Sequence, residues 1–228
     1  MSNTSIIMGE SGTGKSTSIR TLDPATTFII NVMNKPLPFK GYKNKYTLVS
    51  PDAKTGNYYA SKNYDHITLV IKKINSVRPE IKTLIIDDFQ YLMSNEFMNR
   101  ALERGYDKFS EIGKHAYDLL EMLPMLREDL DVFILTHSEP NEHGKMKIKT
   151  IGKMLDEKIT VEGMYSTVLQ TELVNGDYHF ITQGDARHIA KSPMGMFETR
   201  EIPNDLAFVK QKMSAYFNDG ASQWNYMK

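Results

Sequence analysis

The residues best suited to chemistry lie in the first sixteen positions. Gly9, Gly12 and Gly14 are followed by Lys15 and Ser16, which gives the spacing G-x-x-x-x-G-K-S. Glycines let the backbone turn sharply around phosphoryl groups, the lysine ammonium neutralises the β- and γ-phosphates, and the serine hydroxyl suits Mg²⁺. The spacing therefore predicts a phosphate-binding loop, made by Gly9, Glu10, Ser11, Gly12, Thr13, Gly14, Lys15, Ser16 and Thr17.

The loop has the flanking elements that a phosphate loop needs. Ser5 to Met8 is apolar and predicts a short buried strand before it, and residues 16–22 can form a helix after it. The start of that helix would add partial positive charge where phosphates bind. We therefore expect a nucleoside triphosphate, taken as ATP, with Mg²⁺ as its cofactor. The alternative is a glycine-rich turn without a ligand.

Apolar runs predict three further buried strands, at residues 27–30, 83–86 and 132–136. Helical spacing between them predicts crossover helices, at residues 67–77, 89–102 and 109–126. Continuous apolar strands joined by helices indicate an α/β fold with a mainly parallel sheet flanked by helices. Ligands bind at the carboxyl ends of such strands. The strand ends at Gly9, Asn31, Asp87 and His137 should therefore converge.

The pattern changes after His137. Two apolar segments, at residues 164–171 and 178–182, flank Asn175-Gly176, which is a hairpin turn signal, and a helix should start near Asn204. No segment has the composition of a linker. The length of 228 residues fits one α/β domain. We expect a single domain over residues 1–228, with a core of about 1–140 and a C-terminal hairpin and helix at about 141–228.

Polar residues at the strand ends are candidates for catalysis. Asp87 should lie beside the Mg²⁺, acting through a water, and Asp88 is a candidate general base for the attacking water. A helix N-cap explains an aspartate at this position equally well. His137, with Thr136, can contact the γ-phosphate and report its loss, or can cap backbone groups. We predict Lys15, Asp88 and His137 as catalytic residues and Ser16 and Asp87 as metal ligands.

Two lysine-rich segments are candidates for contact with nucleic acid. In an extended chain alternate lysines share one face, so we predict a site for single-stranded DNA at Lys145, Lys147, Lys149 and Lys153. A second tract interleaves lysines with aromatic residues that can stack on bases: Lys35, Phe39, Lys40, Tyr42, Lys43, Lys45 and Tyr46. A solvated loop is the alternative for both segments.

Lys191 is a candidate for a role in a neighbouring subunit. It follows Arg187 and His188 and precedes Pro193. Ring-forming ATPases often insert a basic residue into the nucleotide site of a neighbour. We predict Lys191 as this trans-acting finger, and surface solvation is the alternative.

Composition excludes several classes of protein. The 28 basic and 28 acidic residues balance, so a nucleic-acid surface must be a local patch. The absence of cysteine excludes disulfides, thiol catalysis and cysteine-ligated metals. Apolar runs are too short for a membrane span. The first strand begins close to the N-terminus and leaves no room for a signal peptide, so we expect a cytoplasmic protein.

Together, the loop at Gly9, the acidic strand end at Asp87 and the polar strand end at Thr136-His137 resemble the RecA-type core ATPases. Several stretches resemble, more narrowly, a family of phage-encoded RecA-like ATPases related to single-strand annealing and recombination proteins: residues 28–31 with 35–39, 149–155 and 190–197. The resemblance implies a RecA-like P-loop NTPase fold and a homo-oligomeric ring or filament. It also places phosphate at Lys15 and Ser16, metal support at Asp87 and a strand-end switch at His137.

One region departs from this family pattern. Recombinases of this type usually carry a catalytic glutamate just after the second core strand, but residues 31–35 read Asn-Val-Met-Asn-Lys and contain no acid. Either Asp88 or Glu10 takes the role, or hydrolysis is slow and nucleotide binding is the main signal.

Three functions fit these features. The leading hypothesis is an ATP-dependent motor or switch that acts on single-stranded DNA in phage recombination or replication. The second is a nucleotide-gated scaffold that recruits a nuclease or annealing partner with little turnover. A small-molecule kinase shares the phosphate loop, but the lysine-rich segment after His137 lacks the arginine-bearing lid that such an enzyme normally needs.

Overall fold

The computed structural model describes residues 1–152 and 154–224. Its strands are β1 (Thr4–Gly9), β2 (Thr27–Asn31), β3 (Tyr58–Ala60), β4 (Thr83–Asp87), β5 (Asp131–Pro140), β6 (Met146–Ile148), β7 (Thr167–Val174), β8 (Asp177–Ile181) and β9 (Glu201–Pro203). Its α-helices are α1 (Tyr42–Lys45), α2 (Tyr64–Val77), α3 (Gln90–Asn99), α4 (Asp107–Met122) and α5 (Leu206–Trp224). Shorter turns of other helix types are η1 (Ser16–Thr21), η2 (Leu123–Met125), η3 (Met154–Ile159) and η4 (Val161–Met164).

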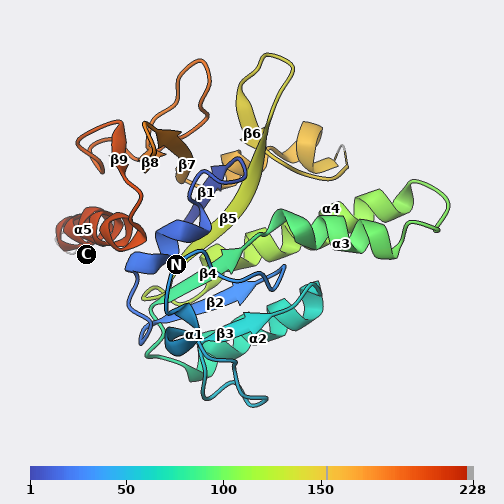
Figure 1. The fold of residues 1–228 in the computed structure, drawn as a ribbon, viewed down its shortest axis with the longest axis horizontal. Coiled ribbons are helices and arrows are strands. Elements are labelled where there is room, and N and C mark those ends of the chain that lie inside the picture. The colour runs from blue at the N-terminus through green and yellow to red at the C-terminus, as the bar shows by residue number, and fades with distance from the viewer. Residues whose placement is uncertain (153, 225–228) are drawn as a thin grey trace.

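Within the described residues the strands form one sheet in the order β3-β2-β4-β5-β1-β7-β8-β9, and β6 pairs with β5 (Figure 1). The pairs from β3 to β7 are parallel, whereas β6, β8 and β9 pair antiparallel. The predicted α/β class and mainly parallel sheet are confirmed.

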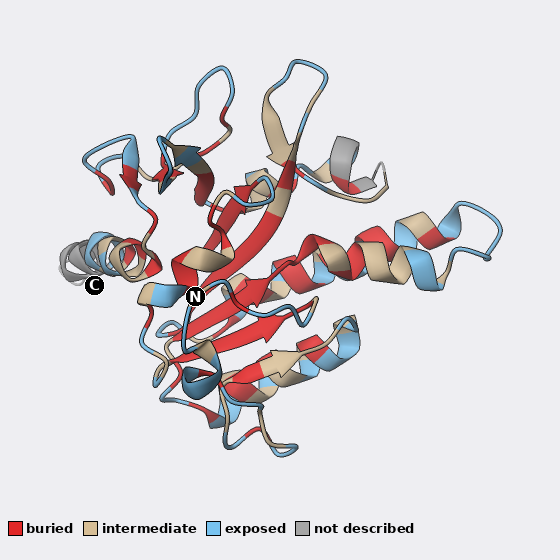
Figure 2. Ribbon diagram, in the orientation of Figure 1, coloured by how far each residue is buried: buried red, intermediate tan, exposed pale blue. Residues whose placement is uncertain are grey.

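Side chains alternate along each strand, so the central strands present apolar residues to both faces of the sheet. Helices cover both faces and bury these residues. Ile6, Phe28 and Ile134 belong to a core that α2, α3 and α4 cover. Ile7 and Phe133 belong to a second core with residues of η1 and α5. Figure 1 shows α2, α3 and α4 grouped on one side of the molecule and α5 on the other, and Figure 2 shows β1, β2 and β4 buried along their whole length. The apolar runs in the sequence follow from this two-sided burial.

The C-terminal half of the chain extends the same sheet. β7 pairs parallel with β1, in the register Ser5 to Thr167, so the core sheet continues past residue 140. β7 and β8 form the predicted hairpin around Asn175 and Gly176, whose φ angles of 53° and 91° both lie in the left-handed region that such a turn requires. The predicted β-hairpin extension is therefore confirmed, with one of its strands beside the phosphate-loop strand.

Some elements differ from the predictions. The helix predicted at residues 16–22 is a six-residue 3₁₀-helix, and it ends where Leu22 turns extended ahead of Asp23-Pro24. The short strands β3 and β9 and the single turn α1 were not predicted, because three or four residues give no readable periodicity. β7 begins at Thr167 rather than at Met164, since residues 161–164 form a 3₁₀ turn.

None of the described helices combines the length and apolar character needed to cross a membrane.

Phe180 tests whether the hairpin is part of the core. Its side chain is fully buried in β8, within the core that includes Ile7 and Phe133. We expect Phe180→Ala to lower the free energy of unfolding by about 3–5 kcal/mol, measured by urea denaturation. The control Leu102→Ala, at a side chain that is 98% exposed, should change it by less than about 0.5 kcal/mol. Similar losses in both variants would contradict the placement of the hairpin in the core.

Candidate nucleotide-binding site

The four predicted strand ends meet at one edge of the sheet. Gly9 pairs with His137, and Asn31 pairs with Asp87. Because β4 lies next to β5, these two pairs are adjacent. The predicted convergence is confirmed, and the phosphate loop begins at the β1 end of this row of strand ends.

At two positions of the loop, close contacts leave room only for glycine. A Cβ at Gly9 would lie 1.9 Å from Thr171 Oγ1, so the strand end has no space for a side chain. Gly14 has a φ of 98°, and a Cβ there would lie 2.8 Å from the ring of Tyr178. Both neighbours belong to the β7–β8 hairpin. The hairpin therefore packs directly on the loop.

Lys15 lies inside the loop. Its Nζ donates to the carbonyl oxygens of Gly9, at 2.8 Å, and Glu10, at 2.6 Å. Burial lowers the pKa of Lys15 to about 8, against the opposing effect of the nearby carboxylates of Asp88 and Asp87. An ammonium desolvated in this way gains from a nearby anion. This is the environment in which a phosphate is bound favourably.

Ser16 and Asp87 are in contact, and both are suited to a divalent cation. Ser16 Oγ donates to Asp87 Oδ1 at 2.8 Å, and Asp87 is buried at the end of β4. Burial, and then the charge of Asp88, raise the pKa of Asp87 to about 7. A hydroxyl next to a buried carboxylate suits Mg²⁺. This ion takes few protein ligands and completes its shell with water and phosphate oxygens. The described residues contain no cluster of three or more acidic, histidine or cysteine side chains that could hold a metal.

Asp88 is buried and paired with two basic groups. Its φ of 65° is uncommon for a residue other than glycine. Its Oδ2 lies 2.6 Å from Lys35 Nζ, and its Oδ1 lies 3.5 Å from His137 Nε2. Burial acts to raise the pKa of Asp88, but the hydrogen bonds from His137 and Lys35 outweigh it and lower the pKa. Asp88 is therefore an ionised carboxylate with a cation already beside it.

Sequence reasoning did not predict this role for Lys35. The residue lies in the loop after β2, where the family resemblance led us to look for an acid. Asn31, at the end of β2, fixes the loop, because its Nδ2 donates to the Lys35 carbonyl at 2.8 Å and its Oδ1 accepts from the Lys35 N–H at 3.3 Å. The loop thus brings a cation, not a carboxylate, to the strand ends.

His137 is held by the segment that follows Asp88. Gln90 Oε1 accepts from the His137 backbone N–H at 3.1 Å and from Thr136 Oγ1 at 3.4 Å. The His137 ring packs edge-on against Tyr91, with centroids 5.9 Å apart. The end of β5 and the start of α3 are therefore connected. Gln90 and Tyr91 were missed because nothing local in the sequence distinguishes them from ordinary helix residues.

The C-terminal half contributes further contacts to the loop. Thr13 Oγ1 and Thr171 Oγ1 are hydrogen-bonded at 2.6 Å, and Asn204 Nδ2 donates to the Gly14 carbonyl at 3.2 Å. Arg20 in turn donates to Asn204 Oδ1 at 3.0 Å. These residues are far apart in the chain, so their meeting could not be read from local patterns.

The first lysine-rich segment forms β6. Its strand pairs with the end of β5, which places Lys147 opposite Glu139, and Lys149 Nζ lies 3.9 Å from Glu139 Oε2. The predicted extended conformation of this segment is confirmed, but an acidic residue from β5 lies within the lysine face. Lys145 directly precedes the strand, and Lys149 directly follows it. Lys153, predicted as a fourth member of the site, lies outside the described residues.

Lys191 lies beside the start of β7. Its backbone N–H and C=O both bond to Val168 at 2.8 Å, and Val168 is level with Ile6 in the middle of β1. Lys191 is therefore away from the strand ends of its own subunit. Its predicted role in a neighbouring subunit stays a prediction.

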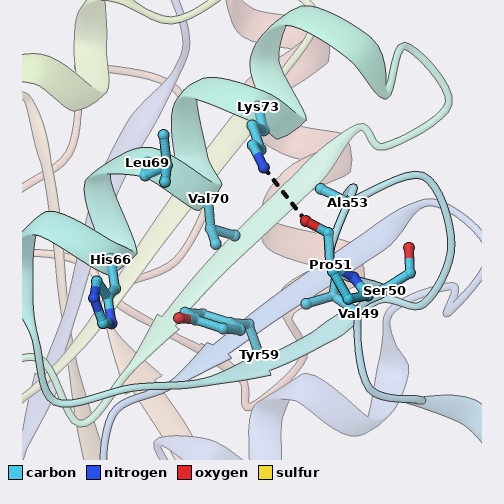
Figure 3. Close-up of a pocket in the computed structure, with 9 residues that line it drawn as sticks. All are labelled: Val49, Ser50, Pro51, Ala53, Tyr59, His66, Leu69, Val70 and Lys73. Carbon is cyan, nitrogen blue, oxygen red and sulfur yellow. Dashed lines mark hydrogen bonds between the residues drawn. The ribbon is translucent and has the colours of Figure 1, made fainter.

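Two surface pockets flank β3. The pocket in Figure 3, of about 320 Å³, lies between α2 and residues 49–53, where Lys73 Nζ donates to the Pro51 carbonyl. None of the predicted site residues lines it. A larger pocket, of about 580 Å³, adjoins the strand ends through Lys35. It brings together lysines and tyrosines of the second basic tract: Lys35, Tyr42, Lys43 and Tyr46, with Tyr58 from β3.

The contact between Gly9 and Thr171 can be tested by a double-mutant cycle. We expect Gly9→Ala to lower the free energy of unfolding by about 1–3 kcal/mol, because the new methyl group has no room. Thr171→Ala should offset part of this loss, so that the double variant loses less than the two single variants together. The control Gly163→Ala has open space around its Cβ and should be nearly neutral. Additive losses in the double variant would count against the contact.

Comparison with known proteins gives the fold. No model of a protein family matches the sequence, and no curated protein matches it. Among solved structures, a KaiC-like protein from the hyperthermophilic archaeon Pyrococcus horikoshii OT3 is similar, with a TM-score of 0.51 and 13% sequence identity. The match covers 88% of this chain and 84% of that chain. Likeness at this identity concerns the fold alone, and by it the chain has a RecA-like fold, as the sequence predicted.

Proposed function

We propose that this chain binds ATP with Mg²⁺ and hydrolyses the ATP. One observation carries the proposal: buried Lys15 lies in a glycine-rich loop at the end of β1, and the next residue, Ser16, donates to buried Asp87 at the end of β4. An ammonium, a hydroxyl and a carboxylate at the ends of parallel strands form the arrangement that phosphoryl transfer requires. A bound Mg²⁺ would neutralise charge on the β- and γ-phosphate oxygens.

Asp88 is the proposed proton acceptor for hydrolysis. The oxygen of the attacking water bonds to the γ-phosphorus while the bond to the β–γ bridging oxygen breaks, ADP leaves with that electron pair, and the water proton passes to the Asp88 carboxylate. Support comes from the burial of Asp88 next to Asp87, whereas the alternative acid, Glu10, is exposed. His137, beside Asp88, is the proposed residue that registers loss of the γ-phosphate.

We also propose that the chain acts on single-stranded DNA, in phage recombination or replication, as a homo-oligomeric ring or filament. The support is the family resemblance, the extended lysine strand at β6, and the pocket where Lys35 and Lys43 lie among tyrosines. Lysines that follow phosphates and aromatic rings that stack on bases are typical of single-strand binding. Lys191 is the proposed contact to the nucleotide of a neighbouring subunit.

A second function is favoured by the state of Asp88. Because Lys35 and His137 already pair with this carboxylate, turnover would be slow, and ATP binding itself would then be the signal. The chain would act as a nucleotide-gated scaffold that recruits a nuclease or annealing partner. ATP turnover measured with and without single-stranded DNA separates the two functions. Stimulation by DNA supports the motor, and tight ATP binding without stimulation supports the scaffold.

Nucleotide binding can be tested directly. At an ATP concentration about a hundred times its Kd, with Mg²⁺, we expect binding to stabilise the protein by about 2.7 kcal/mol. Lys15→Ala should weaken ATP binding by about 10-fold to 100-fold, because a charge-assisted hydrogen bond to phosphate is removed. Thermal denaturation with and without ATP measures the stabilisation, and calorimetric titration measures the affinity, with Lys62→Ala at an exposed lysine as the control. Failure of the wild-type protein to take up ATP or GTP would refute the proposed function.

Binding of single-stranded DNA by the lysines at and around β6 can be tested by charge reversal. Reversing charge at Lys145, Lys147 and Lys149 by substitution with glutamate should weaken binding of single-stranded oligonucleotides. The slope of log affinity against log salt should also fall by about 2, at about 0.7 for each phosphate that a lysine no longer neutralises. The matched control reverses charge at three exposed lysines elsewhere: Lys54, Lys62 and Lys72. If both triple variants bind DNA equally, β6 does not bind the DNA.

A further inference from the structure

Lys35 combines a fixed backbone with an adaptable side chain. Two hydrogen bonds to Asn31 tie its backbone to the end of β2, and Asn31 itself is buried. The Lys35 side chain is 53% exposed, although its Nζ reaches the nearly inaccessible carboxylate of Asp88. The Nζ also lies 5.5 Å from the ring centroid of Tyr91. Its position is therefore set by the carboxylate and by the aromatic ring, while most of its length faces open space.

The charges around Lys35 create a problem for an incoming nucleotide. The terminal phosphate of ATP would lie near Lys15 and Ser16, on the side of the loop that faces the strand ends. There it would meet two buried acids, Asp87 and Asp88, and like charges in a partly desolvated site repel strongly. A divalent ion held by Ser16 and Asp87 would share its charge between Asp87 and the phosphate oxygens that it binds. A second cation is needed on the side of Asp88.

Lys35 is placed to supply that cation. Ser16, the residue after Lys15, donates to Asp87 at 2.8 Å, and the next acid, Asp88, lies 2.6 Å from Lys35 Nζ, so these contacts connect the phosphate loop to Lys35. We propose that Lys35 contacts the terminal phosphate of a bound nucleoside triphosphate, so that its ammonium bridges this phosphate and Asp88. A diphosphate lacks the terminal group and leaves Lys35 paired with Asp88 alone. Lys35 is thereby the residue that distinguishes ATP from ADP.

This inference rests on the proposed function and deepens it. In the loop where a RecA-type enzyme would carry a catalytic acid, this chain carries a specificity-determining cation. Lys35 also lines the pocket that contains Tyr42, Tyr46 and Tyr58. A change in the groups that its ammonium contacts would therefore also change the wall of that pocket. Recognition of the terminal phosphate would in this way reach a surface outside the nucleotide site.

The test compares a non-hydrolysable ATP analogue with ADP, each with Mg²⁺, by calorimetric titration. We expect Lys35→Met, which removes the charge and keeps the length, to weaken binding of the ATP analogue by about 10-fold to 100-fold. It should change ADP affinity by less than about twofold. Lys35→Arg should retain most of the preference for the analogue, and Lys62→Met, at an exposed lysine, should alter neither affinity. Equal weakening of both nucleotides, or of neither, overturns the inference.

A second set of variants separates recognition from a merely structural role. Asp88→Asn removes the carboxylate that Lys35 neutralises, and in this background Lys35→Met leaves no unpaired buried charge. We expect Asp88→Asn to keep the preference for the analogue and the Asp88→Asn/Lys35→Met double variant to lose it. If the double variant discriminates as well as the wild-type protein, Lys35 is only a counterion and the inference fails. If the wild-type protein binds neither nucleotide, the proposed function itself fails, which is a different outcome.

Discussion

The site depends on how two adjacent buried carboxylates are neutralised. Asp87 and Asp88 are each only 3% exposed, and an isolated ionised carboxylate in such a place would be strongly unfavourable. The two acids are stabilised differently. Asp87 accepts from a hydroxyl and has a raised pKa, whereas Asp88 is ionised between Lys35 and His137. The loop after β1, the loop after β2 and the end of β5 each supply one of these partners.

The sheet makes this arrangement possible because its central strands are parallel and buried on both faces. Parallel strands end at the same edge, so residues from four separate segments meet without any local sequence relation. The β7–β8 hairpin then closes the other side of the phosphate loop. Thr171 and Tyr178 leave no room for side chains at Gly9 and Gly14. Residues after 140 are thus as much a part of the site as the loop itself.

The RecA-like fold and the site residues give separate kinds of support. Similarity to the KaiC-like protein, at 13% identity, concerns the fold. The proposed activity rests on Lys15, Ser16 and Asp87 and on their contacts. The cation at Lys35 distinguishes this chain from the family pattern. It lies beside the proposed proton acceptor, and it links the proposed nucleotide site to a pocket lined by tyrosines.

Local patterns in the sequence were enough to predict the glycine-rich loop, the central strands, the hairpin at Asn175-Gly176 and the meeting of strand ends. These features depend on local properties: glycine and lysine spacing, continuous apolar runs and the conformational preference of a turn pair. The folded structure was needed to show that Lys35 pairs with Asp88, that Gln90 accepts from the His137 backbone, that Glu139 faces Lys147 and Lys149, and that β7 lies beside β1. Each of these contacts joins residues distant in the chain or set by loop geometry. Their energies depend on burial and charge in the folded chain, and the local spacing of residues does not reveal them.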